Sequence, residues 1–157
     1  MKLIRSNIFE TNSSSTHSLV MCMADDYEAW KNGKAYYIEA SNEILKPGKE
    51  LDDYCKKQII YDKAEYHREG DKYLYFYGNR DYEERSDMYT EENLAAITRE
   101  DIDKYLKRSN RDSYDSPQTY KEYWDQVEES CYESFEDSIT TPSDDKVVVF
   151  GYYGNDY

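Results

Sequence analysis

The chain has 157 residues, of which 34 are acidic and 20 basic, so that its formal net charge is -14 at pH 7. This excess excludes unaided binding to a nucleic-acid backbone, because a protein that binds phosphates must present Lys and Arg to them, and it favours a basic partner. Aromatic residues form 16% of the sequence, including 19 Tyr, which excludes a disordered chain and predicts a single folded domain over residues 1–157.

Local patterns predict a mixture of strands and helices. In chain order they predict a strand at 1–9, a strand at 18–23, a short helix at 27–30, a strand at 35–38, a helix at 50–68 and a strand at 73–77. A charged and irregular stretch at 80–87 precedes a short helix at 98–106, a helix at 117–137 and a strand at 146–150. This order predicts an α+β fold with a single mixed or antiparallel sheet and helices packed on one face.

The negative charge is concentrated in the segment 111–157, which is predicted to be an acidic helix and strand within the single domain. Residues 1–50 carry 6 basic and 7 acidic side chains, residues 51–110 carry 11 and 15, and residues 111–157 carry 3 and 12. Apolar residues of the predicted helix 117–137 recur with helical spacing on one face. Five carboxylates fall on the opposite face: Glu122, Asp125, Glu129, Glu133 and Glu136.

These five carboxylates are the candidate partner-binding residues. Neighbours on such a stripe lie one helical turn, about 5.4 Å, apart, so the stripe is similar to a phosphate backbone in sign and rough spacing. A basic nucleic-acid channel on another protein could accept it. The alternative is a solvated helix face that keeps the protein soluble. Carboxylates on one helical face make poor cation cages and no DxDxDG loop occurs, so we expect no metal site and no cofactor.

A second unusual feature is the polar run from Glu10 to Ser18, which contains one of the two histidines. A histidine can shuttle protons near neutral pH, and His17 together with Glu10 and Ser15 forms the candidate catalytic group. The candidate phosphate-binding residues are Asn12, Ser13, Ser14 and Thr16. Such a group permits metal-independent cleavage of RNA by its own 2′-hydroxyl. The alternative is a tight loop whose hydroxyls satisfy its own backbone, since no GxSxG, HExxH or P-loop motif occurs.

Cysteine usage and hydropathy predict a cytoplasmic protein. Cys22, Cys55 and Cys131 are odd in number and form no CxxC pair, which favours free thiols over a disulfide framework or a zinc site. No run of 18 apolar residues occurs, and residues 1–6 lack the apolar segment of a signal peptide. We therefore expect no membrane partner.

The string KLIRSNIFETNSSSTHS, from Lys2 to Ser18, resembles the N-terminal signature of small proteins from Gram-positive bacteria and their phages. Some similar small acidic proteins of mobile elements are anti-CRISPR proteins aimed at type II effector nucleases, and one kind causes truncation of the guide RNA. The resemblance covers roughly the first 20 residues.

This resemblance implies a phage or mobile-element inhibitor in the cytoplasm of a bacterial host cell. Its partner would be a basic, nucleic-acid-handling defence nuclease, and RNA would be reached only through that partner. The alternative is a ribonuclease-like enzyme centred on His17 that truncates guide RNA on the same partner. An accessory role in phage development is a third possibility.

Overall fold

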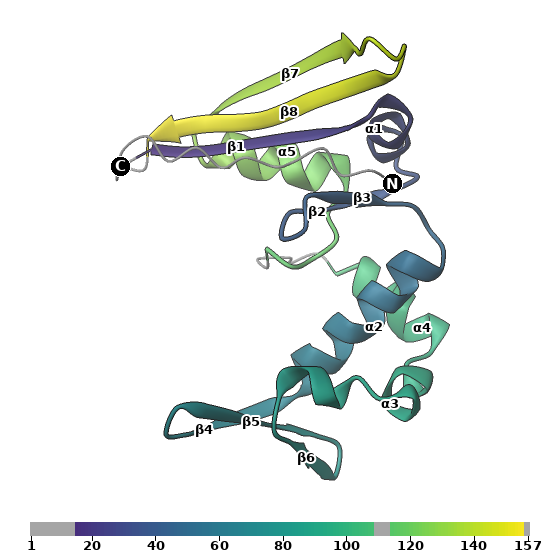
Figure 1. The fold of residues 1–157 in the computed structure, drawn as a ribbon, viewed down its shortest axis with the longest axis vertical. Coiled ribbons are helices and arrows are strands. Elements are labelled where there is room, and N and C mark those ends of the chain that lie inside the picture. Colours follow the sequence, from purple (N-terminus) through teal and green to yellow (C-terminus); the bar gives the residue numbers. More distant parts are fainter. Residues whose placement is uncertain (1–14, 109–113, 156–157) are drawn as a thin grey trace. The chain divides into compact units, whose positions relative to one another are not determined.

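The computed structural model describes residues 15–108 and 114–155, and it divides into two compact units (Figure 1). Unit 1 comprises residues 1–46 and 113–157, and unit 2 comprises residues 47–112. Unit 2 is therefore a continuous segment inserted between the two parts of unit 1. This division concerns compactness, so the prediction of one domain stays a prediction.

The prediction of a single sheet with helices on one face is wrong. The described residues form five α-helices and three small, separate antiparallel sheets. The strand orders are β1 (Ser15–Met23), β8 (Lys146–Asn155) and β7 (Glu133–Thr140) in the first sheet, β2 (Tyr36–Ile38) and β3 (Glu43–Leu45) in the second, and β4 (Glu65–Glu69), β5 (Lys72–Tyr77) and β6 (Arg80–Tyr82) in the third. Two segments predicted as the ends of long helices, near residues 65–68 and 133–137, are strands instead. The first pairs with β5 and the second pairs with β8.

Unit 1 is built around the three-stranded sheet. Its elements are β1 (Ser15–Met23), α1 (Ala24–Lys31), β2 (Tyr36–Ile38), β3 (Glu43–Leu45), α5 (Tyr120–Glu129), β7 (Glu133–Thr140) and β8 (Lys146–Asn155). Strand β8 lies in the centre and pairs antiparallel with both β1 and β7 (Figure 1). Val20 and Phe150 of the sheet share one buried cluster with residues of α1 and α5, so both helices pack against the same face of it.

The core of unit 1 is aromatic and is centred on Trp30, whose side chain is 0% exposed. Five rings surround the Trp30 ring at centroid distances of 5.0 to 5.7 Å: Tyr27, Tyr37, Tyr120, Tyr123 and Phe150. Such edge-to-face and tilted pairs stabilise a fold beyond the area that they bury. The abundant tyrosines thus replace aliphatic residues in the core, which explains how a chain with only 38% hydrophobic residues folds.

A short bridge attaches the segment before α5 to the β2–β3 hairpin. The backbone N–H of Tyr37 donates to the Gln118 carbonyl (2.9 Å), and the N–H of Gln118 donates to the Tyr37 carbonyl (2.7 Å). The indole N–H of Trp30 donates to the same Gln118 carbonyl at 3.0 Å. These bonds connect α1, β2 and the segment just before α5 at the backbone of Gln118.

Unit 2 combines helices with a small sheet. Its elements are α2 (Lys49–Lys63), β4 (Glu65–Glu69), β5 (Lys72–Tyr77), β6 (Arg80–Tyr82), the 3-10 helix η1 (Arg85–Met88), α3 (Glu91–Ala96) and α4 (Arg99–Leu106). Helices α2 and α4 bury the apolar residues Leu51, Cys55, Ile59, Ile60, Ile102 and Tyr105. Burial of these side chains supplies the main stabilisation of the pair.

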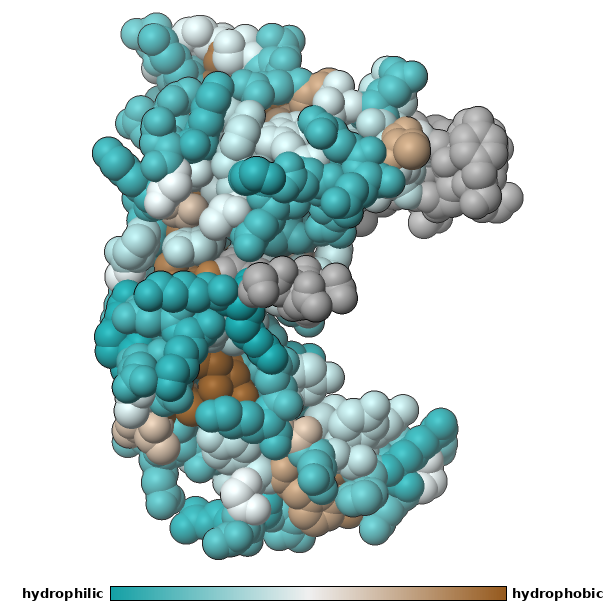
Figure 2. Space-filling model, turned by 180° about the vertical axis from the view of Figure 1, so that it is seen from behind, coloured by the Kyte–Doolittle hydropathy of each residue, from teal (hydrophilic) through white to brown (hydrophobic). Residues whose placement is uncertain are grey.

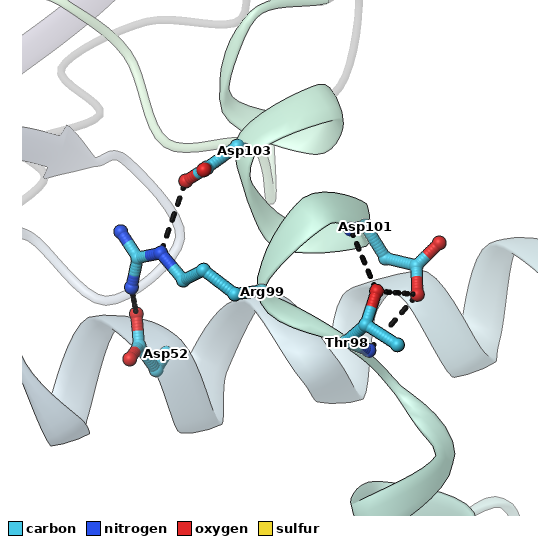
Figure 3. A network of polar contacts seen from close by, with 5 residues as sticks. All are labelled: Asp52, Thr98, Arg99, Asp101 and Asp103. Atoms are coloured by element: carbon cyan, nitrogen blue, oxygen red, sulfur yellow. Dashed lines mark hydrogen bonds and ion pairs between the residues drawn. The ribbon is translucent and has the colours of Figure 1, made fainter.

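The start of α4 shows the local chemistry that its sequence predicts. The Thr98 hydroxyl accepts the Asp101 N–H (3.2 Å), and the Asp101 carboxylate accepts the Thr98 N–H (2.9 Å) (Figure 3). This reciprocal capping box satisfies two backbone donors at the helix start. Arg99 forms ion pairs with Asp103 of its own helix (3.1 Å) and with Asp52 of α2 (2.8 Å). Because all three are partly exposed, these pairs orient α4 and contribute at most about 1 kcal/mol each.

Predictions based on local signals are confirmed at 18–23, 27–30, 73–77, 98–106 and 146–150, which lie in β1, α1, β5, α4 with its cap, and β8. The predicted strand at 1–9 lies outside the described residues. The irregular stretch predicted at 80–87 contains β6 and most of η1. None of the described helices combines the length and the apolar composition needed to cross a bilayer.

The two long helices end earlier than predicted. Helix α2 ends at Lys63 because Ala64 is extended (φ -78, ψ 139), and a turn at Gly70 (φ 62) folds β4 back on β5. Helix α5 ends at Glu129, and Cys131 adopts a positive φ of 58° before β7 begins. In both places pairing with a neighbouring strand overrides an amphipathic spacing that also fits a helix.

Candidate interaction surface and tyrosine-lined pocket

The five carboxylates predicted to line one helix face do not form a single stripe. Glu122, Asp125 and Glu129 lie on α5, whereas Glu133 and Glu136 lie on β7. The regular helical ladder is therefore wrong, because the helix ends four residues before Glu133. The role of these residues in partner binding stays a prediction.

Two of the five carboxylates make structural contacts. The Glu122 carboxylate accepts hydrogen bonds from the backbone N–H (2.7 Å) and the hydroxyl (2.8 Å) of Thr119 and so caps α5. The Glu136 carboxylate lies 4.0 Å from Nζ of Lys31 on α1. Burial, and after it Glu136, raises the pKa of the Tyr27 hydroxyl. Glu122 and Glu136 therefore have structural roles in unit 1 in addition to the charge that they carry.

Two more have local partners within the same segment. Asp125 forms an ion pair with Lys121 one turn earlier on α5. Glu133 accepts a hydrogen bond from the Tyr153 hydroxyl, which stands opposite it in the β7–β8 register. Of the predicted set, Glu129 is the residue for which neither an ion pair nor a side-chain hydrogen bond is described.

We define the acidic surface as Glu128, Glu129, Glu133 and Asp137, four exposed carboxylates along the last turn of α5 and the edge strand β7. No described Lys or Arg forms an ion pair with any of them. Residues 114–155 contain 10 acidic and 2 basic side chains, so this part of unit 1 lacks the cations that would neutralise it. Hydrophilic side chains also dominate the face of the molecule that Figure 2 shows.

The predicted catalytic group is only partly within the described residues. Ser15, Thr16 and His17 belong to β1 rather than to a loop, and they stand opposite Asn155, Gly154 and Tyr153 of β8. The part of the predicted polar loop from Ser15 to Ser18 is therefore strand. The remaining candidates lie outside the described residues: Glu10, Asn12, Ser13 and Ser14. An arrangement of these residues around His17 stays a prediction.

The three cysteines are free. Cys55 is buried, Cys22 is partly buried and Cys131 is exposed. Burial, and after it Asp26, raises the pKa of the Cys22 thiol to about 12, so this thiol stays protonated at neutral pH. Within residues 15–108 and 114–155, no group of three His, Cys, Asp or Glu is arranged to hold a metal ion.

Unit 1 also contains a pocket that the sequence did not predict. Its cavity of about 230 Å³ is lined by Glu39, Tyr123, Gln126, Val127, Ser130, Tyr132 and Tyr152. The Tyr152 hydroxyl donates a hydrogen bond to Oε1 of Glu39 at 3.1 Å. The rings of Tyr132 and Tyr152 stack at a centroid distance of 5.1 Å and an interplanar angle of 7°. Residues from the β2–β3 hairpin, α5 and β8 thus meet at one carboxylate.

The pocket raises the pKa of a carboxyl group and of a tyrosine hydroxyl through burial. Burial raises the pKa of the Glu39 carboxyl, and the hydrogen bond from Tyr152 opposes this rise. No Lys or Arg among the described residues forms an ion pair with Glu39, so the cost of removing its charge from water is not offset by a cation. Burial, and after it the proximity of Tyr152 and Glu39, raises the pKa of the Tyr123 hydroxyl, while Ser18 opposes the rise.

The Glu39 pKa leads to a testable pH dependence. Because its pKa is raised on folding, the folded state holds this proton more tightly than the unfolded state. The free energy of unfolding therefore falls as pH rises from the ordinary glutamate pKa of 4.5 through the folded value. Glu39→Gln removes this dependence, so its stability relative to wild type is expected to increase from about pH 5 to about pH 7.5.

Urea unfolding, followed by tryptophan fluorescence across this pH range, measures the effect. Glu43→Gln in the same hairpin, outside the pocket, is the matched control. A stability difference between Glu39→Gln and wild type that does not change with pH would contradict the prediction.

The described part of unit 1 therefore presents two candidate binding features: an exposed acidic surface and a polar, tyrosine-lined pocket. Comparison with known proteins gave no match, whether to a family model, to a curated protein or to a solved structure. The function must consequently be argued from these two features.

Proposed function

We propose that the protein is an inhibitor of phage or mobile-element origin that binds a basic, nucleic-acid-handling bacterial defence nuclease through the acidic surface. The origin rests on the resemblance of the segment from Lys2 to Ser18. The observation that carries the binding mode is the set of four exposed carboxylates without described ion pairs, in a region with 10 acidic and 2 basic side chains.

Electrostatics explain why such a surface suits a basic partner. Neighbouring like charges repel each other and bring no stability to the isolated fold. Opposite a channel lined by Lys and Arg, the same carboxylates speed association and exclude partners of like charge. A protein bound there competes with the nucleic acid that the channel normally holds. Because the surface is exposed, the attraction weakens with ionic strength.

Charge reversal tests this proposal. The probe is a purified type II effector nuclease without its guide RNA, and the variant carries Lys at Glu128, Glu129, Glu133 and Asp137. We expect wild-type affinity to fall between about 50 and about 300 mM salt, and the variant to bind roughly a hundredfold more weakly at the lower salt concentration. Calorimetric titration measures both.

The matched control makes the same change of net charge in unit 2, at the exposed residues Glu65, Glu69, Asp81 and Glu83. This control is expected to retain most of the affinity, because its substitutions lie in unit 2 whereas the acidic surface belongs to unit 1. Unchanged binding by the unit 1 variant, or no binding of wild type to the nuclease, would contradict the proposal. Circular dichroism establishes that each variant is folded.

A further inference from the structure

The tyrosine-lined pocket contains polar groups whose hydrogen bonding or charge the fold does not fully compensate. Tyr123 is 2% exposed, and its hydroxyl forms no well-aligned hydrogen bond with a described residue, although Ser18 lies close enough to oppose the rise of its pKa. A buried hydroxyl without a partner costs about 1 to 3 kcal/mol, so its presence here is unexplained by packing. The carboxylate of Glu39 lies in the same pocket with a hydrogen bond from Tyr152 and no described cation.

The remaining lining residues restrict what the pocket could accept. Its one carboxylate disfavours an anion, and a single carboxylate is too few to hold a divalent cation. Tyrosine hydroxyls, Gln126 and Ser130 make the lining polar, which disfavours a purely apolar ligand. The carboxamide oxygen of Gln126 already accepts a hydrogen bond from Gln118 at 3.1 Å, which fixes the orientation of that side chain.

A ligand that fits these features carries a positive charge and several N–H donors. Guanidinium meets both conditions, since it is planar, has five donors, stacks on aromatic rings and pairs strongly with a carboxylate. The stacked pair of Tyr132 and Tyr152 provides a flat aromatic element for such a group. An ammonium group lacks the planar shape and has fewer donors.

We infer that this pocket binds a guanidinium group, with Glu39 as its anionic partner, the Tyr123 oxygen as a further acceptor and the Tyr132–Tyr152 pair as its aromatic contact. The group can come from a free guanidino compound or from an arginine side chain of a protein. In the second case the pocket adds to the proposed function, because a basic partner that meets the acidic surface would present arginines.

Titrations of the isotope-labelled full-length protein, followed by NMR, test the chemistry directly. The probes are L-argininamide, L-citrullinamide as the isostere with an uncharged side chain, L-lysinamide, and an acetylated Gly-Arg-Gly amide peptide. We expect argininamide to shift the Gln126 and Ser130 amide signals saturably and to bind at least about tenfold more tightly than citrullinamide. Binding of the peptide as well assigns the source to an arginine side chain, and binding of argininamide alone assigns it to a free compound.

Two variants and one control locate the site. Glu39→Gln is expected to weaken argininamide binding at least about tenfold, and Tyr123→Phe about threefold, while Glu43→Gln retains wild-type binding. Both pocket variants are expected to fold, since each removes a group whose burial is unfavourable. The absence of saturable shifts, equal binding of lysinamide or citrullinamide, or full binding by Glu39→Gln would overturn the inference.

This outcome is separable from that of the nuclease experiment. The variant with four lysines at the acidic surface leaves all the lining residues of the pocket unchanged. It is therefore expected to bind argininamide like wild type even though its nuclease binding is lost. Failure of argininamide binding alone contradicts the guanidinium site, and failure of nuclease binding alone contradicts the proposed function.

Discussion

Replacing Trp30 by alanine is expected to destabilise unit 1 by about 3 to 5 kcal/mol, a loss large enough to unfold a domain of ordinary stability. The Trp30 side chain is fully buried, and five aromatic rings lie within 5.7 Å of its ring. Alanine leaves a cavity that this interlocked cluster cannot fill. It also removes the hydrogen bond to the Gln118 carbonyl, although that carbonyl still accepts the Tyr37 N–H.

Tryptophan fluorescence separates the two units, because both tryptophans of the chain lie in unit 1. In Trp30→Ala, the remaining Trp124 reports on unit 1 while circular dichroism reports on the whole chain. The pair Trp30→Phe and Trp124→Phe is a matched control: only Trp30 loses an indole hydrogen bond, since the Trp124 N–H has no partner among the described residues. A Trp30→Ala variant no less stable than Trp124→Phe would contradict the prediction.

Gly151→Ala is expected to have the second largest effect, a loss of several kcal/mol on the scale of severe backbone and packing mutations. A Cβ atom at Gly151 would stand 1.9 Å from the Ser18 carbonyl oxygen and 3.0 Å from Cζ of Phe135. The first contact is with backbone, which cannot move aside without separating β1 from β8. Urea unfolding measures the loss, and hydrogen exchange of the β1 amides is expected to become faster.

Gly154→Ala provides the comparison within the same strand. Its Cβ would meet the ring of Tyr132 at 2.4 Å, and a side chain can rotate away where a backbone carbonyl cannot. We therefore expect a smaller loss of stability than in Gly151→Ala. Equal stability of Gly151→Ala and wild type would show that the two strands approach each other less closely than described.

Elements with strong local signals were predictable from the sequence. Thr98 and Asp101 cap α4 because they occur three residues apart before an apolar pattern. The run Val147–Phe150 is β-branched and aromatic and lies in β8. Glu133–Thr140 lacked such a signal: Phe135 continues the helical spacing of α5, and only its pairing with β8 makes this segment a strand. That partner lies across a turn, so local periodicity does not reveal it.

The candidate site was predictable in its charge and not in its geometry. Composition alone located the surplus of carboxylates, but not that Glu122 caps a helix or that Glu136 lies near Lys31. The pocket had no sequence signal, because Glu39, Tyr123 and Tyr152 are far apart in the chain and become neighbours only in the folded unit. With 19 Tyr in the sequence, no single one stands out as a lining residue.

The order of the strands also determines when unit 1 can form during synthesis on the ribosome. The register partners of β1 in β8 are more than a hundred positions further along the chain. At translation rates of about 5–20 residues per second, β1 waits on the order of ten seconds for its partner. Unit 2 is a continuous segment and emerges within that interval. Because β8 pairs with both β1 and β7, the aromatic core of unit 1 closes only after β8 has been synthesised, and until then β1 lacks its pairing partner.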